Sequence, residues 1–165
     1  QALALAEGGV DLLWIETMTD LGEASAAVKG VRQVTDLPRF CSLSFGAAGR
    51  TVMGVTPTQA FETLWPLNLS GIGANCGEGL EPVVRALGEM RVASDKAILI
   101  AKPNAGLPRL EGDETVFDLA PQEMAEYVPQ LVDLGAQVIG GCCGSTPQHI
   151  KAMASALAEY QATSS

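Results

Sequence analysis

The chain has 165 residues, of which 47% are hydrophobic and 18% are charged, a composition typical of a folded domain and not of a disordered segment. Nineteen acidic against ten basic residues give a formal net charge of −9, which argues against nucleic acid and anionic membranes as partners. No apolar run reaches the roughly 20 residues that a membrane-spanning helix needs.

The first residues have the pattern of a helix that is already under way. Gln1 is not an initiator methionine, and no basic signal region precedes the apolar residues of segment 1–8. We therefore expect a piece cut from a longer chain. Four cysteines in a chain without an export signal predict reduced thiols and a cytoplasmic location, with metal or catalytic use favoured over disulfides.

Five short apolar segments recur along the chain, and each is followed by a helical pattern. They cover residues 10–17, 40–45, 71–76, 97–104 and 136–143. The centres of successive segments lie 26 to 39 residues apart, which suits a strand, a helix and two loops per unit. Their nearly continuous apolar character is typical of parallel strands that are buried on both faces.

The helices between these strands have recognisable starts. Capping residues or prolines mark them at Asp20, at Thr56-Pro57, at Ala120-Pro121 and at 145–147. The last helix is expected to run to about Tyr160. Five βα units fit either an open doubly wound sheet or part of an eight-stranded barrel, which needs about 250 residues when complete. In both architectures the chemistry gathers at the carboxyl ends of the strands.

Polar or sulfur-containing side chains occupy all five expected strand ends: Glu16, Ser44, Cys76, Asn104 and the pair Cys142-Cys143. Three cysteines would thus meet on one rim, where three thiolates suit Zn²⁺ and leave a fourth position for water or substrate. The alternative is that these cysteines are small buried hydrophobic residues, because no CxxC spacing is present. Adjacent cysteines can share one ion only if the strand has already ended in a turn.

The glycine-rich loop around these cysteines has a second interpretation. Glycines and hydroxyls in residues 140–147 lead into a helix N-terminus, and such a loop can hold a phosphate group. The positive end of the helix would equally stabilise thiolates. We favour the thiolate interpretation because two cysteines lie in the middle of the loop.

Several motifs together resemble one known family. GANC, KPNAGLP and GGCCGSTPQHI, at 73–76, 102–108 and 140–150, closely resemble the homocysteine S-methyltransferases. WIETMTD and GRTVMGVTP, at 14–20 and 49–57, match the same family. It includes the homocysteine-binding module of cobalamin-dependent methionine synthase and the betaine–homocysteine methyltransferases.

This resemblance implies a zinc-dependent parallel (β/α)₈ TIM barrel, of which residues 1–165 would form a single partial domain with strands 4 to 8. It implies an enzyme in which the homocysteine thiolate, bound to zinc, attacks a donor methyl group to give methionine. By position, Cys76, Cys142 and Cys143 would be the zinc ligands and act in catalysis through the metal. Asn104 would hold the fourth coordination position before substrate arrives, and Glu16 would bind the substrate ammonium group.

The resemblance leaves the methyl donor open among methylcobalamin, betaine and S-methylmethionine. The expected partners are homocysteine, a methyl donor, and either a missing N-terminal barrel segment or a cobalamin-binding module. A truncated zinc-binding piece without activity and a phosphate-binding α/β enzyme are the alternatives. Cys41 is expected to be a core thiol, His149 to have a surface or capping role, and Asp20, Asp113 and Asp118 to serve as caps or loop residues.

Overall fold

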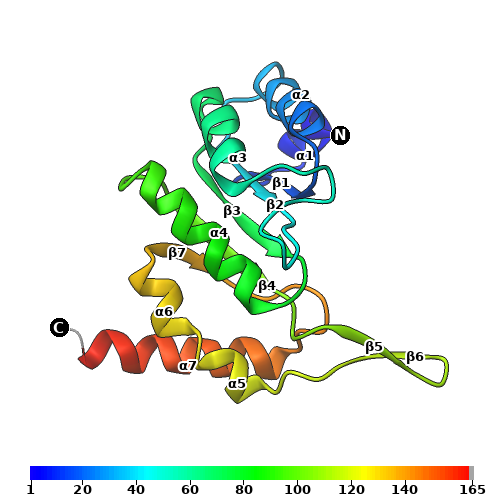
Figure 1. Ribbon diagram of the computed structural model, residues 1–165. Helices are drawn as coiled ribbons and strands as arrows, with labels where there is room; N and C mark the ends of the chain where they lie inside the picture. Colours follow the sequence, from blue (N-terminus) through cyan, green and yellow to red (C-terminus); the bar gives the residue numbers. More distant parts are fainter. Residues whose placement is uncertain (164–165) are drawn as a thin grey trace.

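The computed structural model describes residues 1–163 and is built around a five-stranded parallel sheet (Figure 1). In sheet order the strands are β1 (Leu13–Met18), β2 (Arg39–Leu43), β3 (Gly71–Cys76), β4 (Leu99–Pro103) and β7 (Ala136–Ile139). All five expected strands are present. Their spatial order follows their order in the chain, without the reversal that marks the switch point of a doubly wound sheet.

Helices follow the strands as the sequence predicts. They are α1 (Ala2–Glu7), α2 (Leu21–Arg32), α3 (Pro57–Leu64) with a 3₁₀ turn η1 (Trp65–Leu67), α4 (Leu80–Ala93), α5 (Pro121–Ala125), α6 (Val128–Asp133) and α7 (Pro147–Thr163). Asp20 caps α2 by accepting a hydrogen bond from the Glu23 backbone N–H, and Thr56 forms a capping box with Gln59 at the start of α3. These contacts confirm two of the expected helix starts.

The single helix expected after Pro121 is divided into α5 and α6. Pro129 lies in the first turn of α6. It lacks a backbone N–H, and its ring would clash with the carbonyl of the residue four positions earlier, so one continuous helix cannot pass through it. The last helix continues slightly beyond the expected end near Tyr160, to Thr163.

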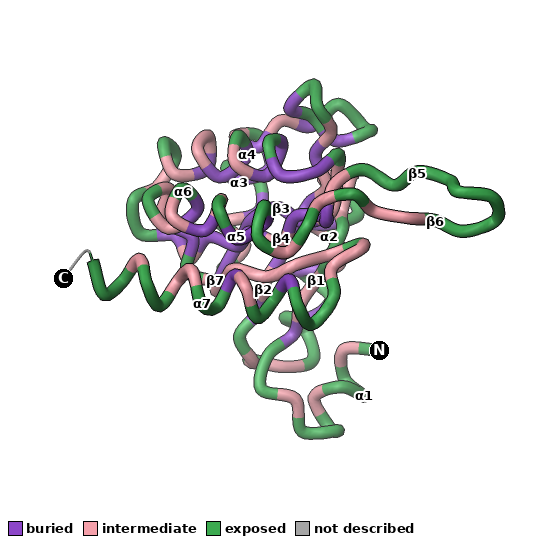
Figure 2. The backbone as a smooth tube through the Cα atoms, turned by 90° about the horizontal axis from the view of Figure 1, so that it is seen from below, coloured by how far each residue is buried: buried purple, intermediate pink, exposed green. Residues whose placement is uncertain are grey.

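Helices α2, α3, α4 and α6 bury one face of the sheet in a single core. The strand residues in this core alternate along each strand: Cys41 and Leu43, Ile72 and Ala74, Leu99 and Ala101. Figure 2 shows the buried residues concentrated on the strands and on the inner sides of α3 and α4. Because helices of a doubly wound sheet cover both faces, this one-sided packing identifies the sheet as the wall of a barrel with its helices outside.

The opposite face of the sheet, which we call the lumen face, carries polar and aromatic side chains. Residues two apart in a strand share a face, so Ser42 and Asn75 lie opposite the helix-packed residues of β2 and β3. The strand register places Asn75 beside Lys102, and Trp14 donates a hydrogen bond from Nε1 to Ser42 Oγ at 3.0 Å. The polar residues of the barrel interior are therefore linked across the strands.

A hairpin between β4 and α5 was not predicted. Strands β5 (Pro108–Glu111) and β6 (Glu114–Phe117) pair antiparallel around the two-residue turn Gly112-Asp113, and the hairpin projects away from the sheet (Figures 1 and 2). Its residues are mostly exposed, so they lack the apolar run that reveals a buried strand. A Gly-Asp pair between two short segments was the available signal. Within residues 1–163 no helix is long and apolar enough to cross a bilayer.

Candidate metal centre

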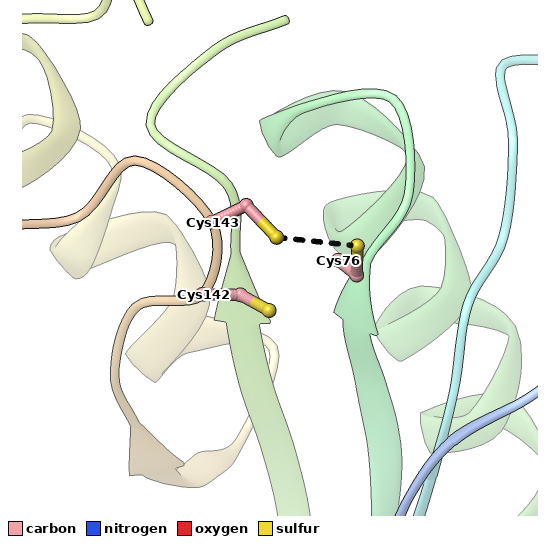
Figure 3. A group of neighbouring side chains, drawn as sticks. All are labelled: Cys76, Cys142 and Cys143. Atoms are coloured by element: carbon pink, nitrogen blue, oxygen red, sulfur yellow. Dashed lines mark hydrogen bonds between the residues drawn. The ribbon is translucent and has the colours of Figure 1, made fainter. Parts of the chain in front are cut away.

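Three cysteine side chains meet at the carboxyl ends of the strands. The Sγ atoms of Cys76, Cys142 and Cys143 all lie within 4.8 Å of one another, and those of Cys76 and Cys143 are 3.9 Å apart. Cys142 and Cys143 both point toward the end of β3 (Figure 3). With Zn–S bonds of about 2.3 Å, a tetrahedral site separates two sulfur ligands by about 3.8 Å. The cluster therefore fits a zinc ion with small side-chain adjustments.

The chain turns sharply after β7, which lets both adjacent cysteines face the same space. Strand β7 ends at Ile139, before the pair. The Cys142 N–H donates to the Pro103 carbonyl at 2.8 Å, and the Cys143 carbonyl accepts from the Ala105 N–H at 2.9 Å. Gly144 follows with a φ of +76°, where an added Cβ would lie 2.6 Å from Phe117 Cβ. Only glycine fits this turn, as the sequence interpretation required.

Asn104 links the two loops that carry the cysteines. Its side chain is nearly buried, and its Oδ1 accepts a hydrogen bond from the Cys143 N–H at 3.0 Å. Its Nδ2 donates to the Gly77 carbonyl at 2.9 Å and to Cys76 Sγ at 3.6 Å. Asn104 thus contacts the cluster through its side-chain nitrogen, while its oxygen is engaged with the backbone N–H of Cys143. Its role as a ligand stays a prediction.

The thiol of Cys143 is a weaker acid than an isolated cysteine. Desolvation, and then the neighbouring Cys142 and Cys76 sulfurs, raise its pKa to about 11. In the metal-free cluster Cys143 is therefore protonated at neutral pH. A bound cation would reverse this preference because it stabilises the thiolate, and metal binding would release the proton.

Cys41 lies apart from this cluster, in the helix-packed core. It is fully buried, and burial raises its pKa to about 12. The expectation of a core thiol is confirmed. Because Cys41 is not part of the rim cluster, it serves as a control in experiments on the other three cysteines.

This difference in burial predicts a difference in thiol reactivity. In the metal-free native protein at pH 8, a thiol reagent should modify Cys76, Cys142 and Cys143 at the rim and leave Cys41 unmodified, because Cys41 is fully buried in the core and the reagent cannot reach its sulfur. The chromophore released by the reagent is measured before and after guanidinium denaturation. The number of reactive thiols per chain should rise from three to four. Four rapid equivalents in the native protein would contradict the placement of Cys41.

His149 caps the last helix from a buried position. Its Nδ1 accepts the Thr146 N–H at 3.1 Å, so its proton lies on Nε2, which donates to the Leu119 carbonyl at 2.9 Å. The capping role is confirmed, whereas a surface position is wrong, since only 6% of the residue is exposed. The backbone N–H of Ser145 bonds to the Cys142 carbonyl. The backbone N–H groups of Ser145 and Thr146, which a phosphate-binding loop would offer to its ligand, are thus already hydrogen-bonded within the protein.

Glu16 lies at the end of β1 on the lumen face and forms an ion pair with Lys102. The Lys102 ammonium also lies 4.6 Å from the centre of the Trp14 ring, a cation–π contact. The Glu16 side chain is 39% exposed and is not part of the cysteine cluster. Its predicted contact with a substrate ammonium stays a prediction. Lys102 was not anticipated, although a lone lysine within an apolar strand was a visible signal.

The structure thus defines an incomplete β/α-barrel wall with three convergent thiols on its rim, a cluster that could hold a metal ion. Residues 1–157 match the family model described as homocysteine S-methyltransferase. The chain belongs to this family, whose members are methyltransferases.

Comparisons with individual proteins agree with this assignment. The chain is 32% identical over 166 residues to methionine synthase from Mycobacterium tuberculosis, covering 97% of this chain and 14% of that protein. For methionine synthase from Mycobacterium leprae the identity is 32% over 163 residues, with 95% and 13% covered.

Solved structures of the homocysteine methyltransferase MmuM from Escherichia coli superpose on the same fold. The apo form gives a TM-score of 0.75 at 25% identity over 93% of this chain and 52% of that chain. The metallated form gives 0.76 at 25% identity over 92% and 47%. The chain therefore spans about half the length of these structures and a small part of the curated methionine synthases.

Proposed function

We propose that this chain is the zinc-binding and homocysteine-binding part of a methyltransferase that converts homocysteine to methionine. The convergence of the Cys76, Cys142 and Cys143 sulfurs carries the proposal. Membership of the homocysteine S-methyltransferase family supports it, as does a similar solved structure described as metallated. Residues 1–165 would form one partial domain of a TIM barrel, and free cysteines suit a cytoplasmic location.

The proposed chemistry needs a thiolate, because the protonated thiol of homocysteine is a poor nucleophile. A zinc ion held by three cysteinates would favour the thiolate form of the substrate and keep its sulfur rich in electrons. The exposure of Cys143 leaves the cluster open to substrate from the rim. Asn104 holds the two cysteine-bearing loops at a fixed separation through its bonds to Gly77 and Cys143.

The methyl transfer itself is an in-line displacement. The new S–CH₃ bond forms as the bond between the methyl group and its donor breaks, and the electron pair of that bond leaves with the donor. The thiol proton has already been released, so no side chain is needed as a general base at this step. The chain's contribution is to bind the substrate in an orientation in which its sulfur faces the donor.

Glu16 is proposed to bind the substrate ammonium group, and its replacement predicts a separable effect. Glu16→Gln should raise the KM for homocysteine by about tenfold, because a charge-assisted hydrogen bond is lost, while zinc content stays unchanged. Glu114→Gln, on the exposed hairpin, is the matched control and should change neither quantity. Steady-state kinetics with metal analysis of both variants tests this, and loss of zinc in Glu16→Gln would point to a structural role.

For the methyl donor we propose methylcobalamin, presented by a cobalamin-binding module. The KPNAGLP motif resembles the methionine-synthase branch of the family, and both sequence relatives described above are methionine synthases. Betaine and S-methylmethionine are the competing donors. The chain spans only a small part of those relatives, and part of the donor-binding surface would belong to the N-terminal units of the barrel.

A methyl-transfer assay on the full-length protein tests the proposal. Homocysteine is offered with each of the three donors in turn, and methionine is measured. Methionine from methylcobalamin alone is the expected result. Zinc binding without methionine from any donor would favour the inactive alternative. A protein that binds phosphate but no zinc would favour the phosphate-binding alternative and overturn the proposal.

A further inference from the structure

Asn75 is a fully buried amide on the lumen face, directly before the metal-site cysteine Cys76. Both the oxygen and the nitrogen of its side-chain amide form hydrogen bonds. Its Oδ1 accepts hydrogen bonds from the Thr17 N–H at 3.1 Å and from Ser42 Oγ at 2.7 Å. Its Nδ2 donates to Thr17 Oγ1 at 2.7 Å and to Cys142 Sγ at 3.8 Å. One amide thus joins β1, β2 and the cysteine loop after β7.

The neighbouring groups fix which way this amide points. Trp14 Nε1 can only donate, and it donates to Ser42 Oγ, so the single Ser42 hydroxyl proton is left for Asn75 Oδ1. The backbone N–H of Thr17 also requires an acceptor at Oδ1. The NH₂ group of Asn75 is therefore directed toward Thr17 Oγ1 and Cys142 Sγ.

At Cys142 this donor acts on a proposed metal ligand. A hydrogen bond to a thiolate is charge-assisted and orients the sulfur. Groups that support metal ligands in this way typically contribute 10- to 100-fold to metal affinity. The bond at 3.8 Å joins Cys142 to the interior network, whereas Cys76 and Asn104 bond to each other on the other side of the cluster.

At Thr17 the same amide holds an unusual backbone conformation. Thr17 has a φ of +63°, which is a genuine outlier for a β-branched residue and persists only when the surroundings impose it. The β1–β2 register shifts between Ile15 and Met18 at this point. Asn75 bonds both the backbone and the hydroxyl of Thr17, and the residue before Thr17 is Glu16.

We propose that Asn75 is a positioning residue that couples the two halves of the site. It orients the Cys142 thiolate toward the metal, and it holds the irregular backbone of β1 at Thr17, next to Glu16. This inference rests on the proposed metal at the cysteine cluster. A purely structural role for Asn75 would leave the electronic environment of the Cys142 sulfur unchanged, whereas the proposed role predicts a change in it.

The test compares Asn75→Leu with two variants of the same buried network in the full-length protein. Ser42→Ala removes a hydrogen bond to Oδ1, and Thr17→Val removes the acceptor Oγ1; neither touches Cys142. Each protein is loaded with Co²⁺ as a spectroscopic probe, and its thiolate-to-cobalt charge-transfer band and its metal dissociation constant are measured. Asn75→Ser, whose side chain is too short to reach Cys142 Sγ, serves if Asn75→Leu does not fold.

We expect the charge-transfer band to shift and the dissociation constant to rise 10- to 100-fold in the Asn75 variant. Ser42→Ala and Thr17→Val should retain the wild-type band, while Thr17→Val should share with the Asn75 variant a raised KM for homocysteine. Unchanged bands and affinities in a folded Asn75 variant overturn the inference and leave the proposed metal site standing. A wild-type protein that takes up no Co²⁺ or Zn²⁺ instead overturns the proposed function itself.

Discussion

Replacing Cys142 by serine is expected to weaken zinc binding by at least about 100-fold, so that the purified variant carries almost no metal. The serine hydroxyl does not ionise at neutral pH and is a poor ligand for zinc, which leaves only the sulfurs of Cys76 and Cys143. The single histidine of the chain, His149, is not expected to replace the lost sulfur ligand, because its ring nitrogens already bond Thr146 and Leu119. The loss is expected without unfolding, since Cys142 lies in a turn and not in the core.

Cys41→Ala is the matched control for this experiment. It removes a thiol of the same chain, but from the helix-packed face of β2, where the residue is fully buried. It should lower stability slightly through the lost sulfur and keep a full complement of zinc. Elemental analysis of both proteins after exhaustive dialysis makes the comparison. Full zinc retention in Cys142→Ser, or equal loss in Cys41→Ala, contradicts a metal centre at the rim.

The strands were predictable from the sequence because each one is a nearly uninterrupted apolar run. Residues of β3 and β4 are buried on both faces, and such burial leaves a signal that needs no knowledge of the partner strands. The exposed strands β5 and β6 leave no such signal, and they were missed. The break at Pro129 was visible in the sequence as a proline, but the apolar periodicity on either side of it suggested one helix.

The cysteine cluster was predictable for a different reason. Parallel strands bring their carboxyl ends to one rim, so Cys76 and Cys142 can be placed together without knowing the strand register. The network around Asn75 depends on that register. Only the pairing of β3 with β4 and of β2 with β3 reveals that Asn75 lies beside Lys102 and reaches Ser42. Contacts across three strands are not a local property of any segment.

Replacing Gly73 by alanine is expected to destabilise the fold by about 3 kcal/mol or more. Gly73 lies in the middle of β3, where an added Cβ would overlap the carbonyl oxygen of Ile100 and lie 2.7 Å from its carbonyl carbon. The obstacle is backbone of the neighbouring strand and not a flexible side chain, so β3 and β4 would have to separate. A loss of this size is a large part of the 5–15 kcal/mol that stabilises a typical domain.

Gly30→Ala provides the control, because Gly30 lies in α2 with no atom within 4 Å of an added Cβ. Alanine there should leave stability unchanged or raise it by about 0.5–1 kcal/mol. Urea unfolding followed by circular dichroism gives both values, and an unchanged midpoint in Gly73→Ala contradicts the close approach of β3 and β4. Gly73→Ala should lose zinc together with its fold, because β3 carries Asn75 and Cys76 to the rim. Cys142→Ser should instead lose zinc while remaining folded. The two variants therefore distinguish zinc loss caused by disruption of strand β3 from zinc loss caused by removal of a metal-binding atom.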